Sequence, residues 1–148
     1  MTAQKSRIAS AADVARRLQP VVVGGDILAY SYVRELHRAY GVERTIVLAA
    51  HDIKMLSTSR FTDYRLEPNV HDPEGLYDAL ERVAAEVSAA DPERVLLVLG
   101  CDDCHARMLS SGKERLEAAG YTVPYLDFAL LDDITQKRRF YELCEQLN

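Results

Sequence analysis

Short apolar runs alternate along the chain with segments in which apolar residues recur every three or four positions. The runs at 20–23, 44–50 and 94–100 are rich in Val, Ile and Leu and predict strands buried on both faces, as in a parallel sheet. Shorter stretches at 63–67 and 122–128 predict two further strands. The helical spacing predicts helices at 10–18, 27–40, 73–90 and 101–120, followed by one or two closing helices over 130–147.

Residues with strong capping preferences mark the ends of several of these helices. Ser10, Asp72 and Thr135 stand where a helix N-cap is expected. Gly41 and Gly120 stand just after helical segments, where glycine commonly ends a helix. These residues therefore indicate several of the helix ends.

Strands that alternate with helices of this length predict an α/β fold: a Rossmann-like three-layer sandwich with a mostly parallel sheet of about five strands. We expect the strand order 3-2-1-4-5, with strands numbered along the chain. The predicted organisation is an N-terminal helical lead-in at 1–19, a Rossmann-like domain at 20–134 and a last helical segment at 135–148.

Composition narrows the function classes. The 148 residues suit one domain, and 18 Lys and Arg against 23 Asp and Glu give a net charge of −5. This balance argues against binding of nucleic acid through overall positive charge. No apolar stretch reaches the roughly 18 residues of a membrane helix, and the first residues lack the apolar core of a secretory signal. With three sparse cysteines, these features predict a cytoplasmic protein with free thiols and no membrane partner.

Two strand ends carry the candidate chemistry. The first strand ends at Gly24, Gly25 and Asp26, and the strand at 94–100 leads into Asp102 and Asp103. In the expected order these ends are neighbours at the switch point, where ligands bind in open α/β sheets. The glycines would allow close approach of a ligand, and the next helix would offer free N–H groups. The alternative is that the glycines form a tight bend and the aspartates are ordinary N-caps.

Other motifs are weaker. GGD lacks the later glycines of GxGxxG, which disfavours a dinucleotide site. The CxxCH stretch from Cys101 to His105 could hold a redox pair, haem or zinc, but two aspartates between the thiols oppose thiolate formation and no second ligand pair exists for zinc. The polar loop 57–60 could hold a carboxylate or phosphate oxygen, or could be a solvated loop. No complete catalytic motif is present.

Four segments together resemble the start of the ATP-grasp carboxylate–amine ligases, in particular the D-aspartate-ligase-like and carbamoyl-phosphate-synthase-like proteins. They are PVVVGGDILAYSYVRELHRAYG, the STSRFTD loop, RVLLVLGCDD and VPYLDFALLDDITQKRRFYELCEQL. The resemblance covers roughly residues 18–148. Its most telling part is the Thr-x-Lys-x-x-Phe-Tyr-x-Leu-Cys motif that starts at Thr135.

The resemblance implies that 20–134 is a pre-ATP-grasp domain, which packs beside an ATP-grasp domain and helps to bind the substrates. In this family ATP phosphorylates a carboxylate, and an amine then displaces the phosphate to form an amide, with magnesium ions bridging the phosphates. We therefore expect a longer parent protein to use ATP and Mg²⁺, with neither bound tightly by this chain. The expected partner is a small carboxylate or amino-acid substrate.

The resemblance also assigns residues by position. The substrate-binding residues that it implies are Gly24, Gly25, Asp26, Ser59, Arg60, Asp102 and Asp103. The residue that it implies for contact with a nucleotide phosphate is Lys137, at the start of the helix that leads into the ATP-grasp domain. No catalytic or metal-binding residue is expected in this chain.

One departure from the family is large. The glycine-rich phosphate loop, the adenine-binding lysine and the magnesium carboxylates of the ATP-grasp lobes are missing, so we expect a fragment that cannot form an amide bond alone. A domain separated from its partner should expose an apolar patch near Phe140, Tyr141 and Leu143, which would also promote homodimerisation. Two alternatives stay open: a stand-alone Rossmann-like or flavodoxin-like module that binds a small ligand, and a thiol-redox protein that uses Cys101 and Cys104.

Overall fold

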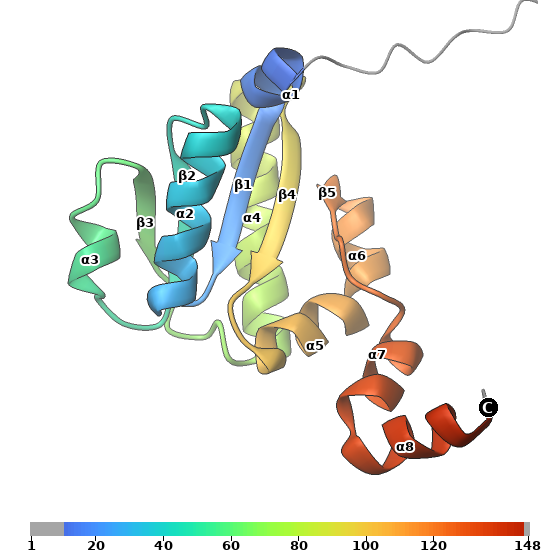
Figure 1. Ribbon diagram of the computed structural model, residues 1–148. Helices are drawn as coiled ribbons and strands as arrows, with labels where there is room; N and C mark the ends of the chain where they lie inside the picture. Colours follow the sequence, from blue (N-terminus) through green and yellow to red (C-terminus); the bar gives the residue numbers. More distant parts are fainter. Residues whose placement is uncertain (1–10, 147–148) are drawn as a thin grey trace, which may run out of the picture.

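The computed structural model describes residues 11–146 and is built around one parallel sheet (Figure 1). Its five strands lie in the order β3-β2-β1-β4-β5. Their bounds are Leu18–Val23 (β1), Thr45–Ala49 (β2), Thr62–Leu66 (β3), Val95–Gly100 (β4) and Tyr121–Thr122 (β5). Every neighbouring pair is parallel. The predicted Rossmann-like α/β sandwich and its strand order are confirmed.

The described part of the chain also contains eight helices. Their bounds are Ala11–Arg17 (α1), Ile27–Tyr40 (α2), Lys54–Ser57 (α3), Pro73–Ala90 (α4), Asp103–Ser111 (α5), Lys113–Ala118 (α6), Phe128–Thr135 (α7) and Lys137–Gln146 (α8). Two predicted caps are confirmed. Asp72 accepts a hydrogen bond from the Gly75 N–H at 2.9 Å, and Gly41 follows α2 in the left-handed conformation. The predicted cap Ser10 lies outside the described residues.

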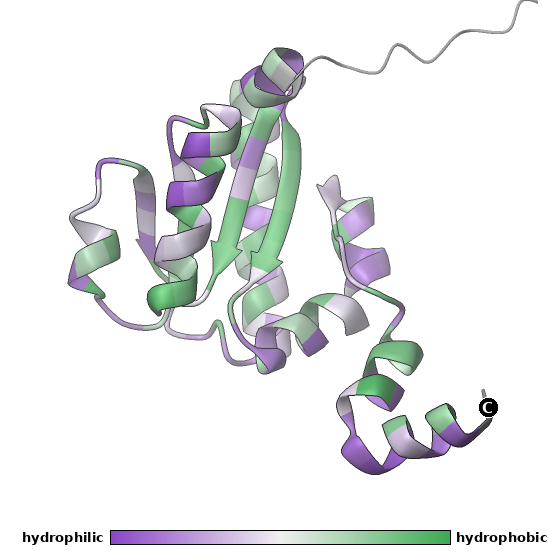
Figure 2. Cartoon of the chain, viewed as in Figure 1, coloured by the Kyte–Doolittle hydropathy of each residue, from purple (hydrophilic) through white to green (hydrophobic). Residues whose placement is uncertain are grey.

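Alternating side chains of the central strands supply two cores. Val21 and Val23 of β1 pack with α4, α5 and α6 on one face, whereas Val22 packs with α2 and α3 on the other. Figure 2 shows β4 and most of β1 in the hydrophobic colour, while the covering helices carry both colours. Because both faces of the central strands are covered, these strands are apolar nearly throughout, as the sequence pattern indicated.

Three local predictions were wrong. The segment 101–120 is two helices, because the chain turns at Gly112, where an added Cβ would lie 2.4 Å from the Tyr77 ring. The predicted strand 122–128 is only the two-residue β5, since Pro124 lacks the N–H of a ladder residue. No helix was predicted between the strands at 44–50 and 63–67, but the short helix α3 lies there.

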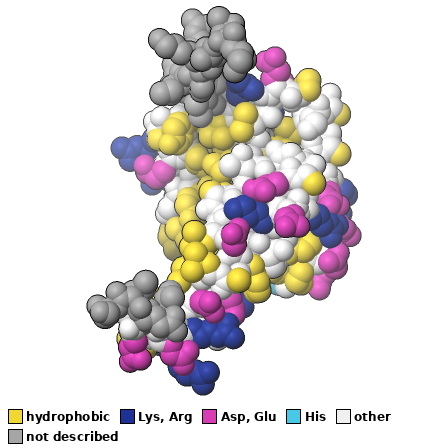
Figure 3. All heavy atoms as spheres, turned by 90° about the vertical axis from the view of Figure 1, so that its right-hand side faces the viewer, with side chains coloured by type: hydrophobic (Ala, Val, Ile, Leu, Met, Phe, Trp, Pro, Cys, Tyr) yellow, Lys and Arg dark blue, Asp and Glu magenta, His cyan; other side chains and the backbone are white. Residues whose placement is uncertain are grey.

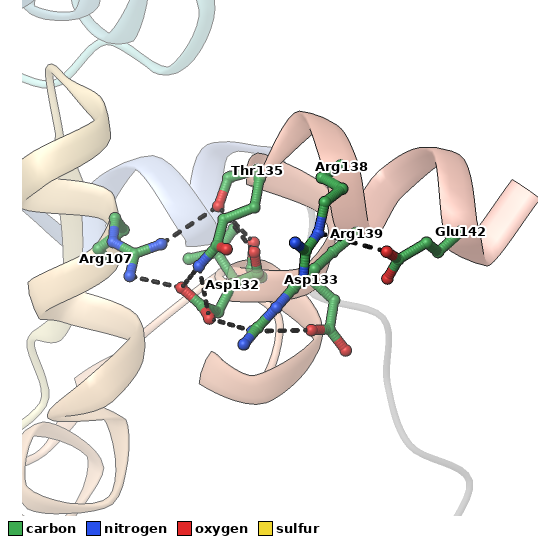
Figure 4. Close-up of polar contacts among 9 residues, drawn as sticks. Arg107, Asp132, Asp133, Thr135, Arg138, Arg139 and Glu142 are labelled. Atoms are coloured by element: carbon green, nitrogen blue, oxygen red, sulfur yellow. Dashed lines mark hydrogen bonds and ion pairs between the residues drawn. The ribbon is translucent and has the colours of Figure 1, made fainter.

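Helix α7 lies beside α5 rather than on the sheet, and α8 packs against α7 (Figure 1). Asp132 of α7 accepts hydrogen bonds from Arg107 of α5 at 2.5 Å and from Arg139 of α8 at 2.6 Å (Figure 4). The prediction that Thr135 is an N-cap was wrong. Thr135 is the last residue of α7, and its hydroxyl donates to the Leu131 carbonyl at 2.7 Å.

Several apolar residues in the described part of α7 and α8 are exposed. Leu130, Phe140 and Tyr141 are exposed, and the Leu143 side chain lies outside the described part. Figure 3 shows hydrophobic side chains over the adjoining face of the body, with charged side chains gathered at the helix pair. The predicted exposure of Phe140 and Tyr141 is confirmed. Among residues 11–146, no helix is long and apolar enough to cross a membrane.

Candidate functional site

The ends of β1 and β4 meet at the carboxyl edge of the sheet, as predicted. The Cys101 N–H donates to the Val23 carbonyl at 3.0 Å, and the Gly24 N–H donates to the Leu48 carbonyl at 2.9 Å. A hollow of about 170 Å³ opens at this edge. Its lining residues are Gly24, Gly25, Asp26, Ala49, Ala50, His51, Ile53, Val70, His71, Cys101, Asp102 and His105. We call this space the edge hollow.

The two glycines of the first turn are required by packing within the protein itself. Gly24 has a φ of +123°, and an added Cβ would lie 2.7 Å from the Cβ of Cys101. A Cβ on Gly25 would lie 3.0 Å from Ile53. The side chains that approach these two glycines closely are therefore Cys101 and Ile53 of the protein itself, rather than a ligand.

Asp26 and Asp102 are helix N-caps, which was the alternative to a role in ligand binding. Oδ1 of Asp26 accepts hydrogen bonds from the N–H groups of Leu28 and Ala29, at 2.9 and 3.0 Å. Oδ1 of Asp102 accepts from the His105 N–H at 2.7 Å. The two carboxylates thus occupy N–H groups that a phosphate would need, and both line the edge hollow. This edge is consequently negative where an anion site would be positive.

His105 is a further candidate at this edge, which the sequence brought in only as the end of the CxxCH stretch. Its side chain is 1% exposed, and its Nδ1 lies 3.0 Å from Oδ2 of Asp102, within ion-pair distance. Neither ring nitrogen meets the geometry of a hydrogen bond with a described residue. The ring stacks on that of His71, with 5.0 Å between centroids. The Asp102 carboxylate therefore faces Nδ1, and Nε2 is the ring nitrogen that has no partner among the described residues.

The surroundings of His105 keep its ring neutral. Burial lowers the pKa of His105, and His71 acts in the same direction, while the carboxylates of Asp102 and Asp26 oppose the shift. The sequence signal that could have found this residue is an Asp three positions before a His at the start of a helix that follows a strand. That spacing lets the aspartate cap the helix and face the imidazole of the next turn.

Cys101 is unsuited to thiolate chemistry. Burial raises the pKa of the Cys101 thiol to about 12, and the carboxylates of Asp26 and Asp102 add to the rise. Cys104 is exposed whereas Cys101 is buried, and both are free thiols. The thiol would therefore stay protonated near neutral pH, which argues against the thiol-redox alternative.

The structure does not bring Ser59 and Arg60 to the edge hollow. They precede β3, and the Thr45 N–H at the start of β2 donates to the carbonyl of their neighbour Phe61 at 2.9 Å. They therefore lie at the amino edge of the parallel sheet. The Arg60 guanidinium stands over the Phe61 ring, 4.7 Å from its centroid. A role for these two residues in substrate binding stays a prediction of the resemblance.

Asp103 and Lys137 also lie apart from the lining of the edge hollow. Each is the exposed first residue of its helix, Asp103 in α5 and Lys137 in α8. Their predicted contacts with substrate and nucleotide remain predictions. In the part of the chain that the structure describes, no group of three or more His, Cys, Asp or Glu side chains could hold a metal ion.

Comparison with known proteins gives one distant relationship. The chain is 25% identical over 127 residues to a D-aspartate ligase of Enterococcus faecium (strain Aus0004). The aligned part is 86% of this chain but only 30% of the ligase, so the chain spans under a third of that relative. No family model matches the chain, and no solved structure matches it. The chain is thus distantly similar to part of a ligase and has an α/β Rossmann-like fold.

Proposed function

We propose that this chain is the substrate-side, pre-ATP-grasp domain of an ATP-dependent ligase that joins a carboxylate to an amine. The observation that carries the proposal is the similarity to a D-aspartate ligase over 127 residues. That length takes in all five strands of the sheet or nearly all, rather than one local motif. In this role the domain binds an amino acid at the edge hollow.

The edge hollow supports a substrate role because of its position and size. It opens at the carboxyl ends of β1 and β4, which are the strands on either side of the switch point in the order β3-β2-β1-β4-β5. Its volume of about 170 Å³ suits a group of a few non-hydrogen atoms. A nucleotide would need a much larger site, since ligand pockets for larger molecules span roughly 300–1,000 Å³.

The described residues do not fit ATP and Mg²⁺. Asp26 and Asp102 cap the helices that could otherwise receive a phosphate, and residues 11–146 offer no three-ligand metal group. The proposal therefore assigns ATP and Mg²⁺ to a separate ATP-grasp domain of a longer protein. On this view Lys137 contacts the nucleotide from the edge of that domain, and the exposed apolar residues of α7 and α8 face it.

The test uses the complete natural protein in which this sequence occurs. ADP release is measured with ATP and Mg²⁺ while amino acids, D-aspartate among them, are supplied with candidate amines, and mass spectrometry identifies the amide. We expect ADP release that depends on both an amino acid and an amine, and none from residues 1–148 alone. Binding of small ligands without ATP turnover by the complete protein would instead indicate a binding module.

A further inference from the structure

The charged side chains that line the edge hollow are all acidic. Two carboxylates, Asp26 and Asp102, line it, and none of its lining residues is Lys or Arg. The three histidines of the lining are His51, His71 and His105. Since burial keeps the His105 ring neutral, the hollow offers acceptors and negative charge but no fixed cation.

One ring nitrogen of His105 is a hydrogen-bond acceptor for which no described residue supplies a donor. The Asp102 carboxylate, 3.0 Å from Nδ1, favours the tautomer that carries its proton on Nδ1. Nε2 is then a lone-pair acceptor, and no described residue donates to it. A ligand with an N–H donor would complete the hydrogen bonding of the ring. The exposed ring of His71 stacks on the His105 ring and lines the same hollow.

We propose that His105, oriented by Asp102, is the hydrogen-bond acceptor for the ammonium group of a small amine or amino-acid substrate in the edge hollow. Calling the ligand a substrate rests on the proposed function, whereas the binding of an ammonium group in the edge hollow does not. The two carboxylates attract a cation and repel a phosphate or an isolated carboxylate. The hollow is thereby specific for the amino end of its ligand.

The experiment is a titration of the 148-residue chain followed by NMR of the His105 ring. The probes are ethylammonium chloride, sodium acetate and sodium phosphate, compared near neutral pH at matched ionic strength. We expect a saturable shift of the His105 resonances with ethylammonium and none with acetate or phosphate. A saturable shift with either anion, or no shift with ethylammonium, would overturn the proposal.

Two variants separate the charge of Asp102 from its capping role. Asp102→Asn keeps an oxygen that can cap α5 but removes the charge, so we expect ethylammonium to bind about tenfold more weakly. Asp72→Asn is the matched control, because Asp72 caps α4 in the same way and does not line the hollow. Equal weakening in the two variants would contradict a local role for Asp102.

A further variant guards against loss of folding. His105→Phe keeps an aromatic ring to stack on His71 but removes both ring nitrogens, and backbone amide shifts of β1 and β4 report whether the fold is retained. We expect the folded variant to lose the ethylammonium-induced shifts at Gly24 to Asp26. Unchanged shifts in a folded His105→Phe chain would show that the amine binds elsewhere. The complete protein can still be a ligase if this proposal fails, so the two tests are distinguishable.

Discussion

The sheet body and the helix pair α7–α8 are held in place by different forces. In the body, Leu80 of α4 is completely buried between the helix and the sheet, among side chains from four strands. In the pair, none of the described residues of α7 is buried. Asp132 instead connects α7 to Arg107 of α5 and to Arg139 of α8 (Figure 4).

The difference shows that an amphipathic sequence predicts a helix but not whether the apolar side of that helix is buried. Both regions have apolar residues at helical spacing, and both form helices. In the body that spacing buries a stripe against the sheet, whereas in the pair Leu130, Phe140 and Tyr141 stay exposed. Exposed ion pairs contribute little stability compared with apolar burial. The pair should therefore separate from the body more easily than the body unfolds.

The largest expected effect comes from truncating a buried leucine. Leu80→Ala should lower the free energy of unfolding by about 2–5 kcal/mol, because it removes apolar contacts and leaves a cavity. Urea denaturation followed by circular dichroism measures this loss. Leu130→Ala in α7 is the matched control, since Leu130 is 45% exposed, and it should change the unfolding midpoint little. Equal losses in the two variants would refute the contrast between the regions.

A second prediction concerns the ion pairs of the helix pair. Asp132→Ala removes the acceptor that Arg107, Gln136 and Arg139 share, so α7 and α8 should separate from α5 more often. Limited trypsin digestion should cut within 128–146 faster than in the wild type, with an unchanged urea midpoint. Asp133→Ala, which loses only the contact with Arg139, should be cut at nearly the wild-type rate. A large drop in the urea midpoint for Asp132→Ala would show that the ion pairs also support the sheet body.

A third prediction uses pH to probe the body at the edge hollow. The folded-state pKa of His105 is lowered, so the unfolded chain binds more protons than the folded chain as the pH falls below the ordinary histidine value of about 6.5. Stability should therefore decline on acidification through that range, and level off below the folded pKa. His71, Asp102 and Asp26 act on the same ring.

The measurement is the thermal midpoint across that pH range for the wild type and for His105→Phe. The variant should lose less stability on acidification, because it has no imidazole to protonate. His71→Ala serves as the control for the neighbouring ring, and it should retain most of the acid-side decline. An identical pH dependence in the wild type and His105→Phe would contradict the assignment of this decline to His105.

The smallest effect is expected on the exposed side of α8. Tyr141 is 65% exposed, so Tyr141→Ser should leave the urea midpoint of the chain almost unchanged. If α8 pairs two copies of the chain in solution, the substitution should lower the apparent mass in analytical ultracentrifugation. A clear fall in the urea midpoint at low protein concentration would show that Tyr141 packs within the chain.

Much of the sheet was predictable because its signal is local. Buried parallel strands are continuous apolar runs, and Asp72 and Gly41 mark helix ends through short-range hydrogen bonds and backbone conformation. The break at Gly112 was not predictable, because it depends on Tyr77, which is 35 positions away in the sequence. The end of α7 at Thr135 likewise involves a contact with Arg107, which is distant in the sequence.

The position of the candidate site was predictable from the sequence, but the contacts of its residues were not. Strand order alone brought Gly24 and Asp26 to the same edge as Asp102. The sequence could not show that Gly24 makes room for Cys101, or that His105 is buried behind the aspartates. The family resemblance also counted Ser59 and Arg60 among the substrate-binding residues, whereas parallel pairing of β2 and β3 carries their loop to the opposite edge.

The most direct test asks which edge of the sheet binds substrate. Backbone amide shifts of the isotope-labelled chain are followed while a panel of amino acids is titrated at constant pH and ionic strength. We expect saturable shifts at 24–26 and 100–105 and none at 58–61. Saturable shifts at 58–61 with an unchanged carboxyl edge would contradict binding at the edge hollow, and so would the absence of shifts at both edges with every amino acid of the panel.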